Sequence, residues 1–420
     1  ASIGKQLRLC SHLILKDIKE PVLAAGKEQT QGSGGNSVTV NLDNFLASQS
    51  LHSGETSISN SHNIFVQAFR SLQHKPASIL RTLWDGDRVF QVTFKGESGS
   101  DAGGVFREGM SRIVEDLFQD TFDLFVRVVN GQEEVGENRD LFIPNPKWSD
   151  INCAYVSLAI DMFEFVGKLM GISLRTGLSL PFQLPSVVWK VLAVHDLDIM
   201  DLNEIDHLSY RLLQEVSQCQ EDWDQKFGTL TWSCIGSSGQ TIKLLQEAPD
   251  KSVPFRDRAL FVEKALLARF EEFMPALQAI RRGFLCVVPQ RVIVLFSPAE
   301  VMNLVCGEPE IDVDEWRKNT QYSGYTPNDK TIVLFWNAVR NLSPKERSML
   351  LRFAWGRSRL SRSSHWPSSF HVSRRGNVDS LIQAHTCFAA IDLPPYTTRQ
   401  QMEWSLGVVI KFGTVGVLNT

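Results

Sequence analysis

The chain has 420 residues, of which 43% are hydrophobic and 21% are charged, a composition typical of globular proteins with enough mass for two or three domains. Its formal net charge of -4 gives no electrostatic reason to expect a nucleic acid or an anionic membrane as partner. The seven cysteines are scattered without any CxxC pair, which argues against a disulfide framework or zinc site and favours a reducing compartment.

No window of the sequence approaches 18 uninterrupted apolar residues, and no charged-then-apolar leader opens the chain. We therefore expect neither membrane insertion nor secretion. The expected location is the cytoplasm, with the nucleus as an alternative. Because the chain begins at Ala1 rather than at an initiator Met, we also expect it to be part of a longer protein.

The first 94 residues alternate between periodic and polar segments. Apolar spacing predicts helices over 4–25 and 64–83, and the alternating pattern over 89–94 predicts a strand. Between the two helices, residues 26–63 are rich in Gly, Ser, Asn and Gln and contain too few apolar side chains to offset the entropy of ordering. Residues 1–63 are therefore expected to form a helix and a mobile polar loop around short ordered segments.

A glycine-rich turn over 94–108 reads FKGESGSDAGGVFRE and leads into a helix. Its spacing fits neither GxGxxG nor GxxxxGK[ST], and the carboxylates of Glu97 and Asp101 would repel a phosphate. Nucleotide binding is therefore disfavoured. The glycines are better explained by a tight turn and close packing of the helix that follows.

The segment 163–174, FEFVGKLMGISL, predicts a buried helix in which Gly167 and Gly171 allow a neighbouring element to approach closely. The GxxxG pattern also occurs in membrane helices. The charges of Glu164 and Lys168 argue against that reading, so we expect a helix in the core of a globular domain.

Further helices are predicted over 187–194, over 256–282 with a kink or restart at Pro275, and from Pro298 onward. Residues 196–250 differ from their surroundings because they are rich in acidic side chains. Three aromatic side chains in this stretch are candidates either for exposed anchors or for core residues: Trp223, Phe227 and Trp232.

The last hundred residues contain two further helix starts. Residues 343–346 read SPKE, a capping box with Pro at the first helical position, which is a fairly specific start signal. Thr398 begins a last helix with apolar residues on one face. These signals predict a compact α/β unit at the carboxyl end.

Cys387 lies where a polar stretch runs into a short apolar strand that Pro394 ends, so its thiol can point to solvent. Six arginines lie within 352–375, and positive charge folded close by would favour the thiolate, the nucleophilic form. An arbitrary free Cys is more often a small buried hydrophobe. The spacing therefore identifies a candidate nucleophile and not yet a mechanism.

These stretches resemble the HECT ubiquitin ligases. HTCF at 385–388, followed by LPPY at 393–396, is similar to the active-site segment of that family, and GESGSDAGG at 96–104 is similar to a stretch of its amino-terminal lobe. GENRD at 136–140 resembles the large HERC subgroup. The resemblance runs in unbroken order over about residues 90–418.

The resemblance implies an α+β, bilobal fold with a large, mostly helical N-lobe and a small α/β C-lobe joined by a short hinge. It implies an N-lobe over 64–321, an E2-binding subdomain at about 196–250 and a C-lobe over 326–420. The hinge is expected at Tyr322, Ser323, Gly324 and Tyr325, with one glycine where family members usually have two.

The same resemblance implies an E3 ubiquitin ligase that uses no metal or organic cofactor. Its partners would be a ubiquitin-loaded E2 conjugating enzyme, ubiquitin and a protein substrate, and Cys387 would carry ubiquitin as a thioester before its transfer to a lysine. Because thioester exchange requires little beyond an accessible sulfur, His385 and Thr386 are expected only to support it. The candidate E2-binding residues are Trp223, Phe227 and Trp232.

Two other functions remain open at this stage. A catalytically weak, HECT-like interaction module is favoured by departures from the family pattern, namely LIQA at 381–384 and Val415 where many members have a Phe. A cysteine hydrolase is disfavoured because such enzymes use a His base, and no His follows Cys387 and no CGxCW signature occurs.

Overall fold

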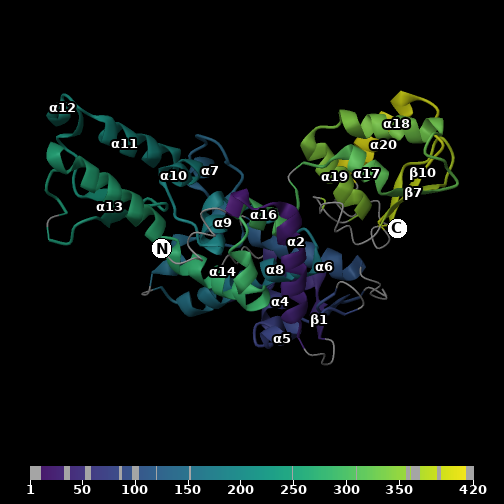
Figure 1. The fold of residues 1–420 in the computed structure, drawn as a ribbon, viewed down its shortest axis with the longest axis horizontal. Coiled ribbons are helices and arrows are strands. Elements are labelled where there is room, and N and C mark those ends of the chain that lie inside the picture. Colours follow the sequence, from purple (N-terminus) through teal and green to yellow (C-terminus); the bar gives the residue numbers. More distant parts are fainter. Residues whose placement is uncertain are drawn as a thin grey trace.

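The computed structural model describes residues 11–32, 38–52, 58–84, 88–96, 104–119, 121–150, 153–247, 249–308, 310–355, 360, 369–385 and 389–412. Within these ranges helices dominate (Figure 1), and the strands form four small sheets. The α+β class predicted from the sequence is therefore confirmed. Most of the glycine-rich turn, residues 97–103, lies outside the described residues.

The amino-terminal elements surround a small parallel sheet. In chain order they are η1 (Ser11–Leu13), α2 (Lys16–Gln29), β1 (Thr39–Leu42), α3 (Asn44–His52), α4 (Ile64–Leu72), α5 (Ala77–Leu80), β2 (Gln91–Phe94), α6 (Gly104–Glu115) and η2 (Asp116–Phe118). Strand β1 pairs in parallel with β2, with Val40 opposite Val92. Strand β1 is one of the short ordered segments expected within the polar loop, and Val40 and Leu42 are buried on one of its faces.

Helix α4 begins at a side-chain cap, since the Asn63 Oδ1 accepts a hydrogen bond from the Val66 N–H at 2.8 Å. The Asp116 carboxylate accepts a second one from the Ile64 N–H at 2.6 Å. Burial raises the pKa of Asp116 to about 6. The start of α4 is thus fixed both by its own sequence and by a residue 52 positions away.

The centre of the molecule is the helix pair α8 (Val156–Thr176) and α14 (Met274–Val287). A Cβ on Gly167 would overlap the Ile280 carbonyl oxygen, and a Cβ on Gly283 would overlap the Glu164 carbonyl oxygen. The close approach predicted at Gly167 is therefore confirmed, and α14 supplies the matching glycine. The surrounding elements are β3 (Phe125–Arg127), α7 (Val129–Gln132), β4 (Phe142–Pro144), η3 (Pro146–Ser149), α9 (Ser186–Ala193), α15 (Gln290–Ile293) and α16 (Pro298–Cys306).

An arm extends from this centre (Figure 1). It consists of α10 (Ile199–Ile205), α11 (His207–Gln218), α12 (Trp223–Phe227), β5 (Ser233–Ile235), β6 (Thr241–Lys243), η4 (Phe255–Asp257) and α13 (Arg258–Glu271). Helix α13 runs back along α11 and ends just before α14 begins, with Pro275 in the first turn of α14. The predicted restart at Pro275 is therefore confirmed.

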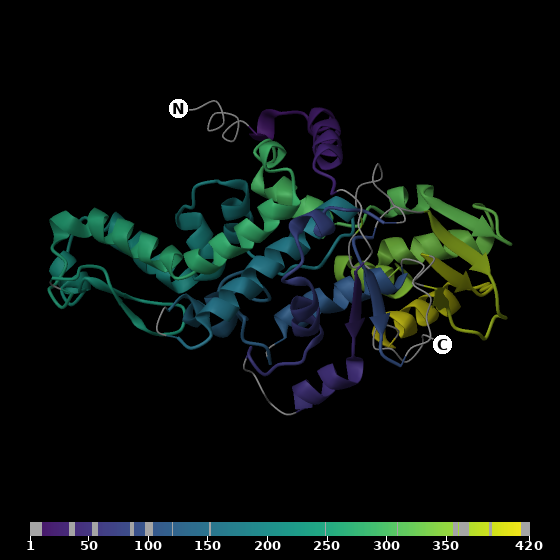
Figure 2. The ribbon, with the colours of Figure 1, turned by 90° about the horizontal axis from the view of Figure 1, so that it is seen from below.

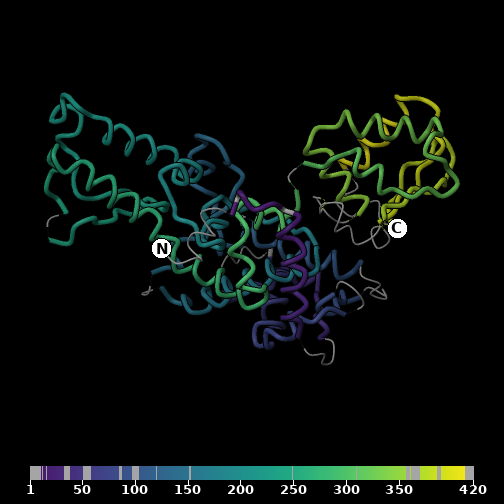
Figure 3. The backbone as a smooth tube through the Cα atoms, viewed as in Figure 1, coloured from purple at the N-terminus to yellow at the C-terminus, as the bar shows by residue number. Residues whose placement is uncertain are grey.

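The carboxyl end forms a four-stranded sheet covered by helices (Figures 1 and 3). Its elements are α17 (Val313–Lys318), β7 (Thr320–Ser323), α18 (Lys330–Asn341), α19 (Pro344–Trp355), β8 (Phe370–Arg374), β9 (Gln383–His385), β10 (Ala390–Leu393) and α20 (Arg399–Phe412). The strand order is β7-β8-β10-β9, parallel except for the antiparallel pair of β10 and β9. Ser343 and Glu346 exchange the expected capping-box hydrogen bonds at the start of α19.

The buried hydrophobic residues fall into two separate clusters. The first, which we call the N-terminal cluster, runs from Leu23 to Cys306, and the second, the C-terminal cluster, runs from Ile311 to Ile410. The chain passes from one to the other at residues 307–310. Within the part of the chain that the structure describes, no helix combines the length and apolarity needed to cross a membrane.

The contact between α8 and α14 yields a prediction about stability. Gly283→Ala places a methyl group against the Glu164 carbonyl, and overpacking of this kind costs about 3 kcal/mol or more because backbone must move. Gly407→Ala on α20, where no atom lies within 4 Å of the added Cβ, serves as the control and should gain roughly 0.5–1 kcal/mol. Urea midpoints measured for both variants distinguish close packing from a general intolerance of substitution.

Candidate functional site

The first region of interest is the end of strand β9. His385 is the last residue of β9, opposite Ala390 of β10, and the candidate nucleophile Cys387 follows two residues later. Thr386, Cys387 and Phe388 themselves lie outside the described residues. The structure therefore describes the sheet on both sides of the candidate nucleophile, and the chain resumes at Ala389 with a positive φ of 50°.

His385 has a carboxylate partner on the neighbouring strand. Its Nε2 lies 2.9 Å from the Asp392 Oδ2, and Asp392 is buried while the His385 side chain is 40% exposed. The Arg375 guanidinium lies 3.4 Å from the same carboxylate oxygen. A buried carboxylate held in this way orients an imidazole and fixes which ring nitrogen carries the proton.

The pairing of His385 with Asp392 was not expected from the sequence. Seven positions separate the two residues, so only the antiparallel alignment of β9 with β10 brings them together. The signal available was an Asp within a short apolar strand, because a buried carboxylate needs a partner. That signal identifies Asp392 as a buried carboxylate in need of a partner, but it does not identify His385 as that partner.

The expected hinge segment lies inside the C-terminal sheet. Tyr322 and Ser323 belong to β7, which pairs along its length with β8, and Gly324 follows with φ of 71°. The Trp336 Nε1 donates to the Tyr322 hydroxyl at 2.9 Å, and the Tyr325 hydroxyl donates to the Leu393 carbonyl at 3.0 Å. Burial raises the pKa of both tyrosines.

The change from one cluster to the other lies at a different place in the chain from this segment. Strand pairing and the partly buried side chains of Tyr322 and Tyr325 hold this segment against the C-terminal cluster, whereas the change of cluster occurs after Cys306. Gly307 ends α16 with φ of 81°, and Glu308 forms an isolated bridge with Leu360. The sequence signal, a glycine between helical patterns, is shared by Gly307 and Gly324, and packing alone distinguishes them.

An ion pair joins α6, which belongs to the N-terminal cluster, to α19, which belongs to the C-terminal cluster. The Glu115 Oε2 lies 2.6 Å from the Arg352 guanidinium, and burial is the main cause that raises the pKa of Glu115. A cavity of about 1030 Å³ beside this pair is lined from both sides, by residues including Pro185 and Trp189 and by Lys345 of α19. A partly exposed pair of this kind contributes only about 0–1 kcal/mol.

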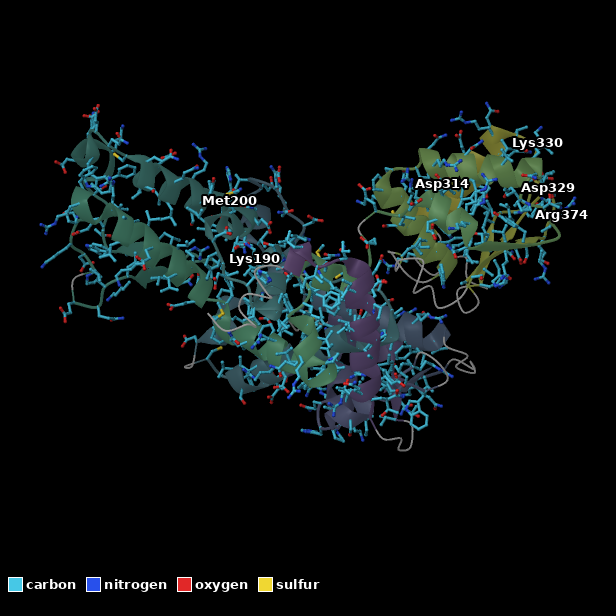
Figure 4. All side chains as sticks on the ribbon, in the orientation of Figure 1. Lys190, Met200, Asp314, Asp329, Lys330 and Arg374 are labelled. Carbon is cyan, nitrogen blue, oxygen red and sulfur yellow. The ribbon has the colours of Figure 1, made fainter. Side chains whose placement is uncertain are left out.

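The second region of interest is a groove in the arm. A cavity of about 840 Å³ lies between α11, α12, the β5–β6 turn and α13, and its lining is predominantly apolar. Three of its apolar side chains are exposed: Leu208 by 48%, Leu212 by 42% and Ile235 by 58%. Met200, also exposed, lies on the preceding helix α10 (Figure 4). Several large apolar side chains exposed together indicate a surface that binds a partner rather than one that faces only water.

The aromatic candidates in the arm divide between core and groove. Trp223 and Trp232 are buried, and the Trp223 Nε1 donates to the Val253 carbonyl at 3.0 Å. Phe227 is partly buried, packs on Trp223 with ring centroids 5.0 Å apart, and lines the groove. Of the three candidates, Phe227 alone lines the groove. The sequence analysis selected aromatic residues in this region. It therefore missed three aliphatic ones: Leu208, Leu212 and Ile235.

The described cysteines differ from one another in burial. Cys219 and Cys306 are buried. Burial raises the pKa of Cys234 to about 11 and also raises that of Cys286, which disfavours the thiolate in both. All five described cysteines, these four and Cys153, are free thiols. Among the described residues, no group of three or more His, Cys, Asp or Glu side chains could hold a metal ion.

Comparison with known proteins identifies the class of this chain. Residues 111–416 match the family described as HECT-domain (ubiquitin-transferase), which covers more than half of the chain. The chain is therefore a member of the HECT-domain family. The resemblance found in its sequence motifs is confirmed.

Individual relatives agree with this assignment. The chain is 32% identical over 337 residues to the E3 ubiquitin-protein ligase HERC2 of Mus musculus, a match that covers 77% of this chain and 7% of the relative. It is 29% identical over 368 residues to the E3 ubiquitin-protein ligase RSP5 of Chaetomium thermophilum, which covers 83% of this chain and 42% of the relative. The similarity to HERC2 bears out the expected relation to the HERC subgroup, and the chain spans less than half the length of either relative.

Proposed function

We propose that this chain is the catalytic part of an E3 ubiquitin ligase, which accepts ubiquitin from a ubiquitin-loaded E2 conjugating enzyme on Cys387 and transfers it to a lysine of a protein substrate. The observation that carries the proposal is membership of the HECT-domain family over residues 111–416, a range that includes the HTCF motif. The free thiols and the absence of membrane helices among the described residues are compatible with action in the cytoplasm or nucleus.

The first half reaction forms a thioester on Cys387. The Cys387 thiolate attacks the carbonyl carbon of the thioester between ubiquitin and the E2, a new carbon–sulfur bond forms, and the E2 cysteine leaves as a thiolate. A thiol of ordinary pKa is ionised to a few per cent at neutral pH, so no dedicated base is required. Cys234 and Cys286, whose pKa values are raised by burial, are unsuited to this role.

The second half reaction transfers the ubiquitin acyl group to a substrate lysine. The amine attacks the same carbonyl carbon, an isopeptide bond forms, and Cys387 leaves as a thiolate while the nitrogen loses a proton. We assign a supporting role in this step to His385, whose imidazole lies two residues before Cys387 and is oriented by the Asp392 carboxylate. Thr386 is assigned only to local support of the backbone.

The groove in the arm is the proposed binding site for the E2. We infer that its occupant is a protein surface, because Leu208 and Leu212 of α11 and Ile235 of β5 present exposed apolar side chains together. Phe227 contributes to its lining, while Trp223 and Trp232 support it from the core. This assignment agrees with the E2-binding subdomain that HECT resemblance implies at about 196–250.

Transfer of ubiquitin from the E2 to Cys387 requires movement between the two clusters. We propose that these clusters are the N-lobe and C-lobe of a bilobal domain. The arm and the C-terminal sheet lie at opposite ends of the long axis in two perpendicular views (Figures 1 and 2), so Cys387 must approach an E2 bound in the groove. We propose that residues 307–310 act as the hinge, in place of Tyr322–Tyr325. The partly exposed ion pair of Glu115 and Arg352 spans the two clusters and must break for this motion.

Cys387→Ala tests the covalent step. With a panel of ubiquitin-loaded E2 enzymes, the unaltered chain should form an adduct that thiol reagents cleave, and the variant should form none, as resolved on a nonreducing gel. Cys286→Ala is the matched control and should retain the adduct, because burial raises the pKa of that thiol and it does not line the groove.

Absence of an adduct with every E2 tested would favour the noncatalytic interaction module. Release of free ubiquitin from conjugates without an adduct would instead favour a hydrolase.

His385→Gln tests the second half reaction. The side chain is 40% exposed, so the fold should tolerate the change, and transfer to a lysine should slow by roughly 100-fold while thioester formation is nearly unchanged. Single-turnover chase of preformed thioester with free lysine measures transfer alone. Asp392→Asn, which keeps the shape of the side chain that contacts His385, should slow transfer to lysine to a smaller extent.

An equal effect of His385→Gln on both steps, or an effect on neither, would remove His385 from this role.

Glu310→Pro tests the hinge. A second proline beside Pro309 restricts the backbone of the connection, so both loading from the E2 and transfer to lysine should slow several-fold. Glu310→Ala removes the same charge without stiffening the chain and should behave like the unaltered protein in the same rate measurements. Unchanged rates for the proline variant, with an unchanged unfolding midpoint, would contradict movement about residues 307–310.

A further inference from the structure

A charged cluster lies buried beneath the apolar groove of the arm. We call it the groove-floor cluster, and its members are Asp206, Ser237, Arg269 and Glu272. The Arg269 side chain is 1% exposed, and both carboxylates are nearly as well covered. Asp206, Ser237 and Arg269 line the cavity, so the cluster forms part of the surface on which an occupant would rest.

One side of the cluster holds the start of α11. The Arg269 guanidinium donates to the Asp206 Oδ2 at 2.7 Å. Asp206 is also the N-cap of α11, since its Oδ1 accepts from the Ser209 N–H at 2.9 Å and its Oδ2 from the Ser209 hydroxyl at 2.6 Å. Arg269 therefore contacts the residue that caps the helix carrying Leu208 and Leu212.

The other side of the cluster holds the β5–β6 turn. Arg269 donates to the Ser237 hydroxyl at 3.1 Å and pairs with the Glu272 Oε1. The Glu272 Oε2 accepts from the Ser237 N–H at 2.9 Å and from the Gln240 side-chain amide at 2.9 Å. The turn that follows Ile235 is thus held by the same guanidinium that holds α11.

A single planar guanidinium accordingly links the two walls of the groove. Arginine presents several donors in a rigid fork, so it fixes the relative position of two carboxylates in a way that a lysine ammonium does not. Burial of three charges is expensive, and apolar residues of similar volume stabilise a core at least as well. A contribution to folding stability therefore does not explain why these charges are buried here. Their role in fixing the distance between the two walls of the groove does explain it.

We propose that Arg269 is a positioning residue for the E2 conjugating enzyme, acting through Asp206 and Glu272 to fix the separation of α11 and the β5–β6 turn. This inference rests on the proposed function, in which the groove receives the E2. Arg269 acts on the groove that binds the E2 and not on the chemistry at Cys387, so it governs recognition of the donor and leaves the bond-forming steps unaltered.

The test measures the rate of thioester formation on Cys387 against the concentration of ubiquitin-loaded E2. Arg269→Met should raise KM roughly tenfold or more with kcat nearly unchanged, because only the binding surface is displaced. Arg269→Lys should give an intermediate KM, since it restores the charge without the fork. Lys264→Met on the same helix α13, whose side chain does not line the groove, is the matched control and should leave KM unchanged.

Loss of Arg269 leaves two buried carboxylates without a counter-charge, so the single variant can also fail to fold. The triple variant Asp206→Asn, Arg269→Met, Glu272→Gln removes all three charges and retains hydrogen-bonding caps. A raised KM in the triple variant with a normal unfolding midpoint supports the inference. An unchanged KM in a folded triple variant overturns it.

The same experiment separates this inference from the function on which it rests. If the unaltered chain forms no thioester with any E2 of the panel, the proposed function fails and the inference with it. If the chain forms the thioester and KM is insensitive to Arg269, the inference alone fails.

Discussion

The reciprocal glycine contact between α8 and α14 is the constraint on which the remaining structure depends. Gly167 and Gly283 each lie where a side chain would overlap a backbone carbonyl of the other helix. Backbones this close leave no space for alternative packing, so the direction of α14 is fixed. Helix α13 leads directly into α14, and the arm with its groove therefore takes its orientation from a contact between two glycines in the core.

Buried charges connect elements that lie far apart in the sequence. Lys19, fully buried, pairs with Glu300 at 2.6 Å and secures α2 against the capping box of α16. Asp392 orients His385 across the C-terminal sheet, and Arg269 links the two walls of the groove. Each charge carries a desolvation cost that only one geometry offsets. We infer that such pairs select one arrangement among several that apolar packing would allow.

The two regions of chemical interest are built in different ways. The groove, proposed as a recognition surface, has exposed aliphatic side chains over a buried polar floor, and its lining comes from α7, α11, α12, β5 and α13. The end of β9, which leads into the proposed reactive segment, is placed by strand pairing within a separate hydrophobic cluster. A short connection at residues 307–310 joins the cluster that carries the groove to the cluster that carries the sheet. This separation of donor recognition from acyl transfer is what the proposed function requires.

The sequence by itself determined the class of protein, the candidate nucleophile and most of the helices, because motifs, caps and apolar periodicity are local properties of the chain. Pro275, the SPKE capping box and Gly167 could all be interpreted from their immediate neighbours. The partner of His385, the exposed side chains of the groove and the position of the connection between clusters could not. Asp392 meets His385 only through strand register, Trp223 is a core residue only because other elements cover it, and Gly307 differs from Gly324 only in what surrounds it. Burial and pairing depend on residues distant in sequence, and for that reason only the tertiary structure decided them.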